Sequence, residues 1–133
     1  MCASFRRTAR ALTQLYEEAL RPLGLRATQF TILQALELAG EVSQDRLGKM
    51  LAMDSTSLTR TLAIMSRKDW IAERRGRDRR ERQLRLSKGG ELKLRRALPA
   101  WKKVQSQVRG KLGERTWRSL FRLTQKVAEL VKA

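Results

Sequence analysis

The sequence of 133 residues contains no histidine and a single cysteine, Cys2. A disulfide within one chain is therefore excluded, and so are zinc sites built from the usual Cys and His ligands. The sequence also lacks a phosphate-binding glycine-rich loop and a nucleophile motif. We therefore expect neither an enzyme nor a bound metal or cofactor.

Long apolar runs are missing as well. No stretch approaches the roughly 18 apolar residues of a membrane span. The first twenty residues carry Arg6, Arg7 and Arg10 and lack the apolar run of a signal peptide. A composition with a single cysteine fits a reducing compartment, so we expect a cytoplasmic protein that has no membrane partner.

Acidic residues are few. Asp and Glu number 13 against 30 Lys and Arg, which gives a formal net charge of +17. Such an excess attracts nucleic acids and other polyanions without specifying a sequence. The hydrophobic fraction of 41% argues against a disordered chain, and the length fits one domain, which we expect to span residues 1–133.

Arginines gather in the middle of the chain. Seven of them lie between Arg74 and Arg85, and this run includes Gly76, which permits a tight turn. Leu84 and Leu86 alternate with polar residues, which is the period of a half-buried strand. We predict a β-hairpin with a basic tip that suits a polyanion. The alternative is a solvated loop or a disordered tail.

Apolar residues at steps of three and four predict helices before this hairpin. We expect one over about 4–20, a second from an N-cap at Thr28 to Gly40, a third capped by Ser43 and a fourth, over about 55–68, capped by Asp54. The third and fourth, joined by a tight turn, are typical of a helix-turn-helix. In the second and fourth helices we expect these residues to face inward: Phe30, Leu33, Leu36, Leu38, Leu58, Leu62 and Met65.

Helices are predicted after the hairpin as well. Ser87 is placed to cap a long helix that begins near Lys88, and Pro99 should kink this helix without ending it. Gly110 and Gly113 mark the next break, and a last helix follows over about 114–131.

The residues around the hairpin match a known signature. Asp78, Arg80, Leu84, Leu86, Ser87 and Gly90 fit the spacing D-x-R-x-x-x-L-x-L-T/S-x-x-G. The chain thus resembles the MarR family of bacterial transcription regulators, whose wing carries this signature. Gly48 and Trp70 stand where relatives often have alanine and glycine. The resemblance implies an α+β, mostly α fold: a winged helix-turn-helix over about 28–90, with dimerisation helices over about 1–22 and 91–133.

Polar residues line one side of the fourth helix near its start. In a helix-turn-helix this end of the second helix enters the major groove of DNA. Arg60 is the side chain that could read guanine through two hydrogen bonds. The alternative is that a Ser/Thr cluster only caps the helix. The proposed groove contacts are Ser55, Thr56, Ser57, Thr59 and Arg60.

For the wing, the resemblance implies that Arg80 enters the minor groove while Asp78 orients it. A narrow minor groove attracts arginine, and a carboxylate two residues away on the same side of a strand could fix the guanidinium. The alternative for Asp78 is a turn residue. Four further arginines are expected to contact phosphates and to add affinity without specificity. They are Arg75, Arg77, Arg79 and Arg82.

The terminal helices carry more apolar residues than a compact winged domain needs. Because family members dimerise through such helices, we expect a two-fold interface that includes Phe5, Leu12, Trp117, Phe121, Val127 and Val131. An intramolecular core is the alternative.

Many relatives also bind a small effector between their dimerisation helices and their DNA-binding lobe. Tyr16 and Trp101 could line a cleft for a small aromatic or anionic effector, although plain core packing is the alternative. Some relatives sense oxidants through an N-terminal cysteine. Cys2 lies at a terminus expected to fray, so we predict that it is dispensable.

The resulting hypothesis is a ligand-responsive repressor that binds a pseudo-palindromic operator in double-stranded DNA as a homodimer. The alternative is a non-specific architectural protein that binds nucleic acid through its charge.

Overall fold

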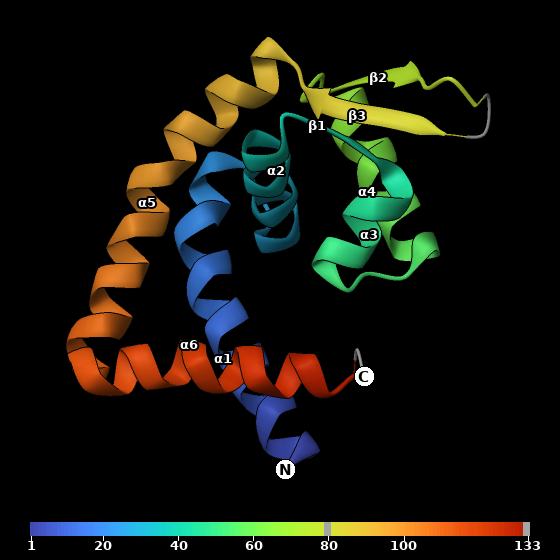
Figure 1. Ribbon diagram of the computed structural model, residues 1–133. Coiled ribbons are helices and arrows are strands. Elements are labelled where there is room, and N and C mark those ends of the chain that lie inside the picture. The colour runs from blue at the N-terminus through green and yellow to red at the C-terminus, as the bar shows by residue number, and fades with distance from the viewer. Residues whose placement is uncertain (79–80, 132–133) are drawn as a thin grey trace.

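The computed structural model describes residues 1–78 and 81–131, and it arranges them as helices around a small sheet (Figure 1). This confirms the predicted α+β, mostly α winged-helix class. In chain order the elements are α1 (Cys2–Leu20), the 3-10 helix η1 (Arg21–Leu23), α2 (Ala27–Ala39), β1 (Glu41–Ser43), α3 (Gln44–Leu51), α4 (Ser55–Arg67), β2 (Ile71–Arg75), β3 (Arg82–Leu86), α5 (Lys88–Leu112) and α6 (Glu114–Leu130).

The three strands form an antiparallel sheet in the order β1-β3-β2. Leu84 on the central strand lies between Val42 and Glu73. Leu84 and Leu86 are buried whereas Arg85 is exposed, which confirms the predicted alternation. We call strands β2 and β3, together with the segment that joins them, the wing. In Figure 1 the wing extends past β1, away from α5.

Helices α3 and α4 form the predicted helix-turn-helix, and both predicted caps are confirmed. The Ser43 hydroxyl oxygen accepts a hydrogen bond from the Arg46 amide at 3.2 Å, and the Asp54 carboxylate accepts one from the Ser57 amide at 2.8 Å. Between the helices, Ala52 adopts a left-handed conformation with φ 52°, which ends α3 in a tight turn. The buried residues of α4 are Leu58, Leu62 and Met65, as expected.

The core joins the helix-turn-helix to the other helices. Large side chains that are almost completely buried come from α1, α2, α3, α4 and β3: Leu20, Ile32, Leu33, Leu36, Leu47, Leu58, Met65 and Leu84. Burying one such side chain contributes roughly 1.5–3 kcal/mol. Leu94 and Ala97 of α5 belong to the same cluster. The exposed start of α4 and the wing are therefore anchored to the same hydrophobic core.

Two glycines at the start of α5 allow its backbone to pack closely against the residues that precede β2. A side-chain carbon built on Gly90 would lie 2.0 Å from the Trp70 carbonyl oxygen, and one on Gly89 would lie 2.6 Å from that of Asp69. The Ser87 hydroxyl oxygen accepts a hydrogen bond from the Gly90 amide at 3.1 Å, which confirms it as the cap of α5. The last glycine of the wing signature is thus needed for a close backbone approach.

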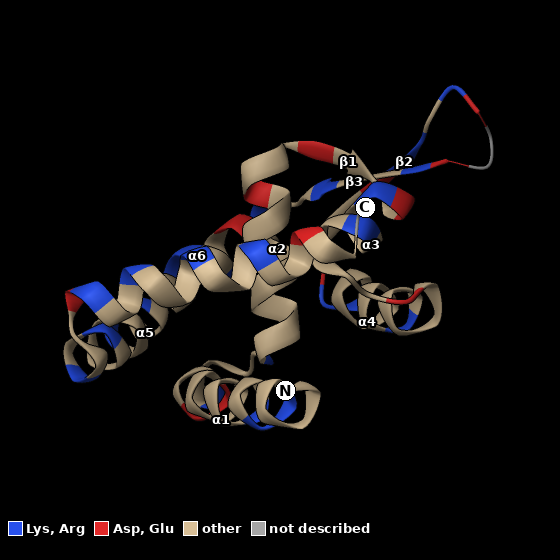
Figure 2. Cartoon of the chain, turned by 60° about the horizontal axis from the view of Figure 1, so that its bottom comes forward, with Lys and Arg blue, Asp and Glu red and all other residues tan. Residues whose placement is uncertain are grey.

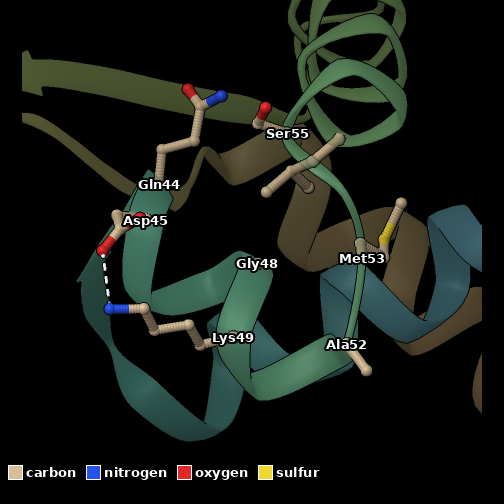
Figure 3. Close-up of a pocket in the computed structure, with 8 residues that line it drawn as sticks. Gln44, Asp45, Gly48, Lys49, Ala52, Met53 and Ser55 are labelled. Carbon is tan, nitrogen blue, oxygen red and sulfur yellow. Dashed lines mark ion pairs between the residues drawn. The ribbon is translucent and has the colours of Figure 1, made fainter.

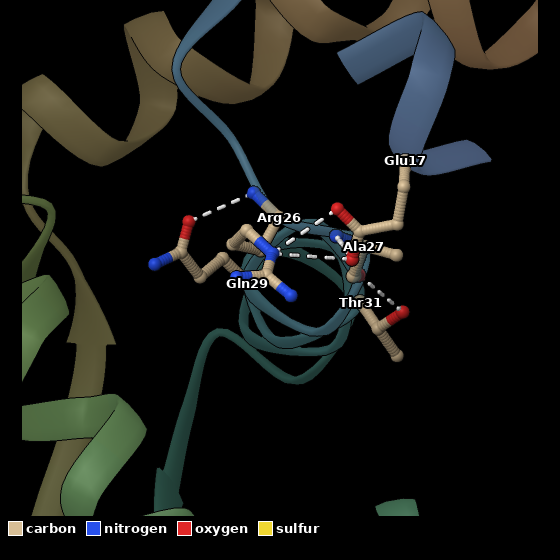
Figure 4. Close-up of polar contacts among 5 residues, drawn as sticks. All are labelled: Glu17, Arg26, Ala27, Gln29 and Thr31. Atoms are coloured by element: carbon tan, nitrogen blue, oxygen red, sulfur yellow. Dashed lines mark hydrogen bonds and ion pairs between the residues drawn. The ribbon is translucent and has the colours of Figure 1, made fainter. Parts of the chain in front are cut away.

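The start of α2 differs from the prediction. Thr28 is not the N-cap, because the helix already begins at Ala27. The Ala27 amide donates to the Glu17 carboxylate at 3.0 Å, and the Arg26 amide donates to the Gln29 side chain at 2.9 Å (Figure 4). Glu17 belongs to α1, so a carboxylate from another helix satisfies a free amide at the start of α2, where the sequence pattern had placed Thr28 as the cap.

Leu38 is also placed differently from the prediction. Its side chain is 87% exposed, whereas Leu36 is completely buried. Residues two apart in a helix lie about 200° apart around its axis, so these two leucines cannot share one face. Leu38 therefore belongs to the solvent side of α2.

Helix α5 continues past Pro99, as predicted, and also past Gly110, where a break was expected. The break falls at Gly113, whose φ of 82° favours glycine. Among the described residues we find no helix with the length and apolar character needed to cross a bilayer.

Candidate nucleic-acid interface

The N-terminus of α4 is fixed by Asp54. Its carboxylate accepts hydrogen bonds from both the amide and the hydroxyl of Ser57, each at 2.8 Å. These bonds, the amide first, lower the pKa of Asp54. A charged carboxylate at this position also interacts favourably with the helix dipole. The Ser57 hydroxyl donates its hydrogen to Asp54, so its oxygen is left to accept a hydrogen bond from another group.

Thr59 is held from α3. The Gln44 side-chain amide donates to the Thr59 hydroxyl oxygen at 3.0 Å, which leaves the hydroxyl hydrogen of Thr59 for another acceptor. Reasoning from sequence missed Gln44, because nothing in the pattern of α3 indicates a contact 15 residues away. The pair fixes the first residue of α3 against the exposed side of α4.

A surface pocket of about 460 Å³ lies between α3 and the start of α4 (Figure 3). On its α3 side, Lys49 and Asp45 form an ion pair at 3.1 Å. The Ser55 side chain lies at its opposite edge. The residues that line the pocket are Gln44, Asp45, Gly48, Lys49, Ala52, Met53, Ser55 and Leu58.

Ser55, Thr56 and Arg60 are exposed on α4. Within residues 1–78 and 81–131, the structure shows no ion pair that engages the Arg60 guanidinium. The structure therefore brings the five predicted groove residues together on one helix, with Ser57 and Thr59 already in local hydrogen bonds. Among residues 1–78 and 81–131, no hydrogen bond or ion pair engages the side chains of the remaining three, which are exposed to solvent.

The wing presents a row of arginines. Arg75, Arg77 and Arg82 are exposed, and Arg75 and Arg82 lie opposite each other at the end of the β2–β3 ladder. Arg79 and Arg80 lie outside the described residues. Figure 2 shows basic residues along the hairpin where it projects from the body. Such an arrangement favours contact with phosphates.

Asp78 does not lie on a strand, contrary to the prediction that placed it on the same side of a strand as Arg80. Pairing of β2 with β3 ends at Arg75 and Arg82, so Asp78 falls in the connecting segment. Its carbonyl oxygen accepts a hydrogen bond from the Glu81 amide at 2.9 Å. The geometry of a strand therefore cannot explain how Asp78 would orient Arg80, and the turn alternative stays open.

A further arginine of the wing is bound by a carboxylate that reasoning from sequence missed. The Arg74 guanidinium donates to both oxygens of Glu41, from Nε and, at 3.2 Å, from Nη2. This interaction raises the pKa of Arg74. Glu41 lies on β1, whereas Arg74 lies on β2.

The apolar residues predicted for dimerisation lie on α1 and α6, except Val131, which directly follows α6, and most remain exposed in the single chain. Helix α6 buries none of its residues. The exposed fractions of Phe5, Phe121 and Val127 are 42%, 51% and 39%. The Trp117 and Phe121 rings meet edge to face with centroids 5.0 Å apart. Leu12 and Trp117 are half-buried, and Val131 is exposed at the end of α6. Packing within the single chain therefore accounts for only part of this stripe.

Tyr16 and Trp101, predicted to line a cleft, do lie around one cavity of about 420 Å³ together with Phe30 and Gln105. The Tyr16 hydroxyl donates to the Gln105 side-chain oxygen. Burial raises the pKa of Tyr16, so it is neutral at pH 7. The Trp101 ring lies 5.8 Å from that of Phe30, between centroids. Both aromatics also pack against the core.

Two other features bear on possible chemistry. Cys2 is an exposed free thiol at the first position of α1. In the part of the chain that the structure describes, we find no group of three or more side chains that could hold a metal ion.

Comparison with known proteins gives the family. Residues 23–81 match the sequence model of the MarR family. The chain is 30% identical over 86 residues to YwoH, an uncharacterized HTH-type transcriptional regulator of Bacillus subtilis; the match covers 65% of this chain and spans 63% of that protein's length.

Solved structures extend the similarity over the whole chain. The M. tuberculosis transcriptional regulator MosR, in complex with DNA, is 34% identical, with a TM-score of 0.84 over 100% of this chain and 98% of that one. A cysteine-to-serine mutant of E. coli MarR complexed with operator DNA has the same fold, with a TM-score of 0.86 over 94% of this chain and 91% of that one at 24% identity. These matches confirm the family predicted from the wing signature. The chain belongs to the MarR family of transcriptional regulators.

Proposed function

We propose that this regulator recognises a specific sequence in double-stranded DNA and acts as a homodimer on a pseudo-palindromic operator. The observation that carries the proposal is the exposed end of α4, where Ser55, Thr56 and Arg60 face solvent beside a wing rich in arginine. Helix ends of this kind enter the major groove, and arginine-rich wings suit phosphates and the minor groove. MosR and MarR, its structural neighbours, were both solved with DNA.

The homodimer is proposed from the terminal helices. Residues at about 28–90 would form the DNA-binding lobe, and those at about 1–22 and 91–133 the dimerisation helices. The unburied stripe on α6, with Phe121 and Val127, would be covered by the same stripe of a second copy. Two reading heads related by a two-fold axis then require an operator with two related half-sites.

Repression would be steric, because a bound dimer occupies the operator. The cavity beside Tyr16 and Trp101 lies within the size range of small-molecule sites, about 300–1,000 Å³, at about 420 Å³. We infer that a small aromatic or anionic effector binds there and changes the spacing of the two heads. Quenching of tryptophan fluorescence by such a compound should disappear in Trp101→Phe.

Selection from a pool of random duplexes tests the proposal. The protein should enrich an inverted repeat whose half-site centres are about 10 base pairs apart, or a multiple of that distance. A non-specific architectural protein, which the net charge of +17 alone would suit, should leave the pool unchanged after repeated rounds. That result would overturn the proposed function.

A further inference from the structure

The ion pair between Glu41 and Arg74 joins two strands that are not neighbours. Strand β3 lies between β1 and β2. Glu41 pairs in register with Arg85, and Arg74 pairs with Gln83. All four residues lie on the sheet face opposite the buried Leu84, because residues paired across strands share a face and faces alternate along a strand. The Arg74 side chain therefore crosses the central strand to reach both carboxylate oxygens of Glu41.

This contact links the wing to the strand that leads into the helix-turn-helix. Strand β1 ends at Ser43, and Ser43 is the cap of α3. The next residue, Gln44, holds Thr59 on α4 through a hydrogen bond of 3.0 Å. A continuous set of contacts thus runs from Arg74 on the wing to the exposed side of α4.

Arg74 differs in this respect from the other arginines of the wing. Within the described residues, Arg75, Arg77, Arg82 and Arg85 form no ion pair, whereas Arg74 gives two hydrogen bonds to one carboxylate. A guanidinium in a two-bond pair has a defined orientation and a neutralised charge. It is therefore poorly suited to release a counterion by contacting phosphate, which is the role expected of Arg75, Arg77 and Arg82.

We propose that Glu41 and Arg74 form a positioning pair that sets the wing relative to α3 and α4, and so fixes the spacing between the minor-groove and major-groove contacts. The proposal rests on the proposed function, because it concerns how the same DNA interface is held in shape. Arg74 in this account touches no DNA. Glu41, a negative residue near the DNA surface, strengthens binding.

Charge alone predicts the opposite sign. Removal of the Glu41 charge should tighten DNA binding, because it deletes a repulsion from phosphate and frees a guanidinium. If the ion pair orders the wing before DNA binds, its removal should weaken binding, because the free energy needed to order the wing on binding lowers affinity. The pair is partly exposed, with side-chain exposures of 60% for Arg74 and 33% for Glu41, and exposed pairs add little to folding stability. Affinity and stability should therefore change separately.

The test uses the full chain and its selected duplex, measured by fluorescence anisotropy across a range of salt concentrations. Glu41→Gln and Arg74→Gln should each weaken binding about three- to tenfold, since each dimer has two wings, with an unchanged salt dependence. The double variant should be no weaker than either single one. The matched control is Arg75→Gln, in the adjacent position of β2, which should weaken binding and lower the salt slope by about one unit per wing.

The variant Arg74→Lys retains the positive charge and separates an ion pair with Glu41 from a contact with phosphate. A lysine cannot reproduce the two-bond fork to Glu41, so this variant should bind as weakly as Arg74→Gln. If Arg74 contacts phosphate, lysine should keep most of the affinity and the salt slope. Tighter binding by Glu41→Gln with a steeper salt slope, or full affinity of Arg74→Lys, would overturn the proposal.

A readout without DNA separates this proposal from the proposed function. In the free protein, Glu41→Gln should speed amide hydrogen exchange in β2 and β3 about three- to fivefold, and leave α4 unchanged. Unchanged exchange in the wing would contradict the positioning role even if the parent bound its operator. If the parent shows no sequence preference, the proposed function fails, and the exchange result still decides whether the pair holds the wing.

Discussion

Three arginines illustrate how the same side chain can have different hydrogen-bond and ion-pair partners: Arg60, Arg67 and Arg74. Arg74 is bound by Glu41 across the sheet. Arg67, in the last turn of α4, donates to the Ala63 carbonyl oxygen at 3.4 Å. Arg60 is exposed near the start of α4 and has no ion pair within the described part of the chain. We therefore propose Arg60 as the arginine of the three that is free to read a base.

Replacement of Arg60 by alanine should therefore change sequence preference. We expect Arg60→Ala to cost about 1–3 kcal/mol of binding free energy and to relax preference at one position per half-site. Arg67→Ala removes the same charge from the other end of α4 and is the matched control, which should weaken all duplexes alike. The selection experiment repeated with both variants measures the effect. If both variants enrich the parent's site unchanged, Arg60 does not read a base.

At the scale of elements, local signals were predictable from sequence. The caps Ser43, Asp54 and Ser87 were identified correctly, because each acts on amides within three residues of itself. The alternation of Leu84 and Leu86 placed β3 for a similar reason. These features depend on neighbours along the chain, which the sequence displays directly.

Features set by contacts between distant residues were not predictable. The start of α2, where Thr28 had been predicted as the cap, is instead bonded by the carboxylate of Glu17, which lies ten residues before Ala27. Arg74 and Glu41 are 33 residues apart, with a strand between them. A run of arginines in the sequence indicates a basic surface. Which of these arginines is neutralised depends on how the strands are ordered in the sheet.

Two glycines of α5 should respond in opposite directions to the same substitution. Gly90→Ala places a carbon 2.0 Å from the Trp70 carbonyl oxygen, and we expect it to destabilise the fold by about 1–3 kcal/mol or more, as overpacking does. Apart from its chain neighbours and its own helix backbone, no atom of the described residues lies within 4 Å of the corresponding position at Gly110. Gly110→Ala should stabilise α5 by about 1 kcal/mol through helix propensity. Urea unfolding measures both, and equal effects of the two variants would contradict the close approach at Gly90.

At the scale of the whole molecule, positive charge is not confined to the wing. Residues 88–133 carry thirteen Lys and Arg against three Asp and Glu, and Figure 2 shows basic residues along α5 and α6. Such charge increases attraction to any duplex and makes that attraction strongly dependent on salt. Under the proposed function, specificity would therefore come from the placement of α4 and the wing, and from pairing two copies in a fixed geometry.

The unburied stripe of α6 predicts that the copies pair through the terminal helices. Light scattering at micromolar concentration should give twice the chain mass of 15.4 kDa. Phe121 is 51% exposed in the single chain, so Phe121→Glu should give folded monomers, because its charge is buried only in the dimer. Arg115→Gln is the control at an exposed position of α6 outside the apolar stripe, and it should remain dimeric.

Two outcomes would contradict this interface. One is a monodisperse parent monomer that binds its operator tightly. The other is a Phe121→Glu variant that stays dimeric while it keeps its fold.

The affinity of the parent for its selected duplex, compared with a shuffled duplex of the same composition, tests the central claim most directly. Both are measured by fluorescence anisotropy at one fixed salt concentration, because the charge of the chain makes affinities at different salt concentrations incomparable. Sequence-specific recognition by a dimer predicts that the selected duplex binds at least about 10³-fold more tightly. Equal affinities would show that charge alone binds the DNA, and would contradict the assignment of α4 and the wing as reading elements.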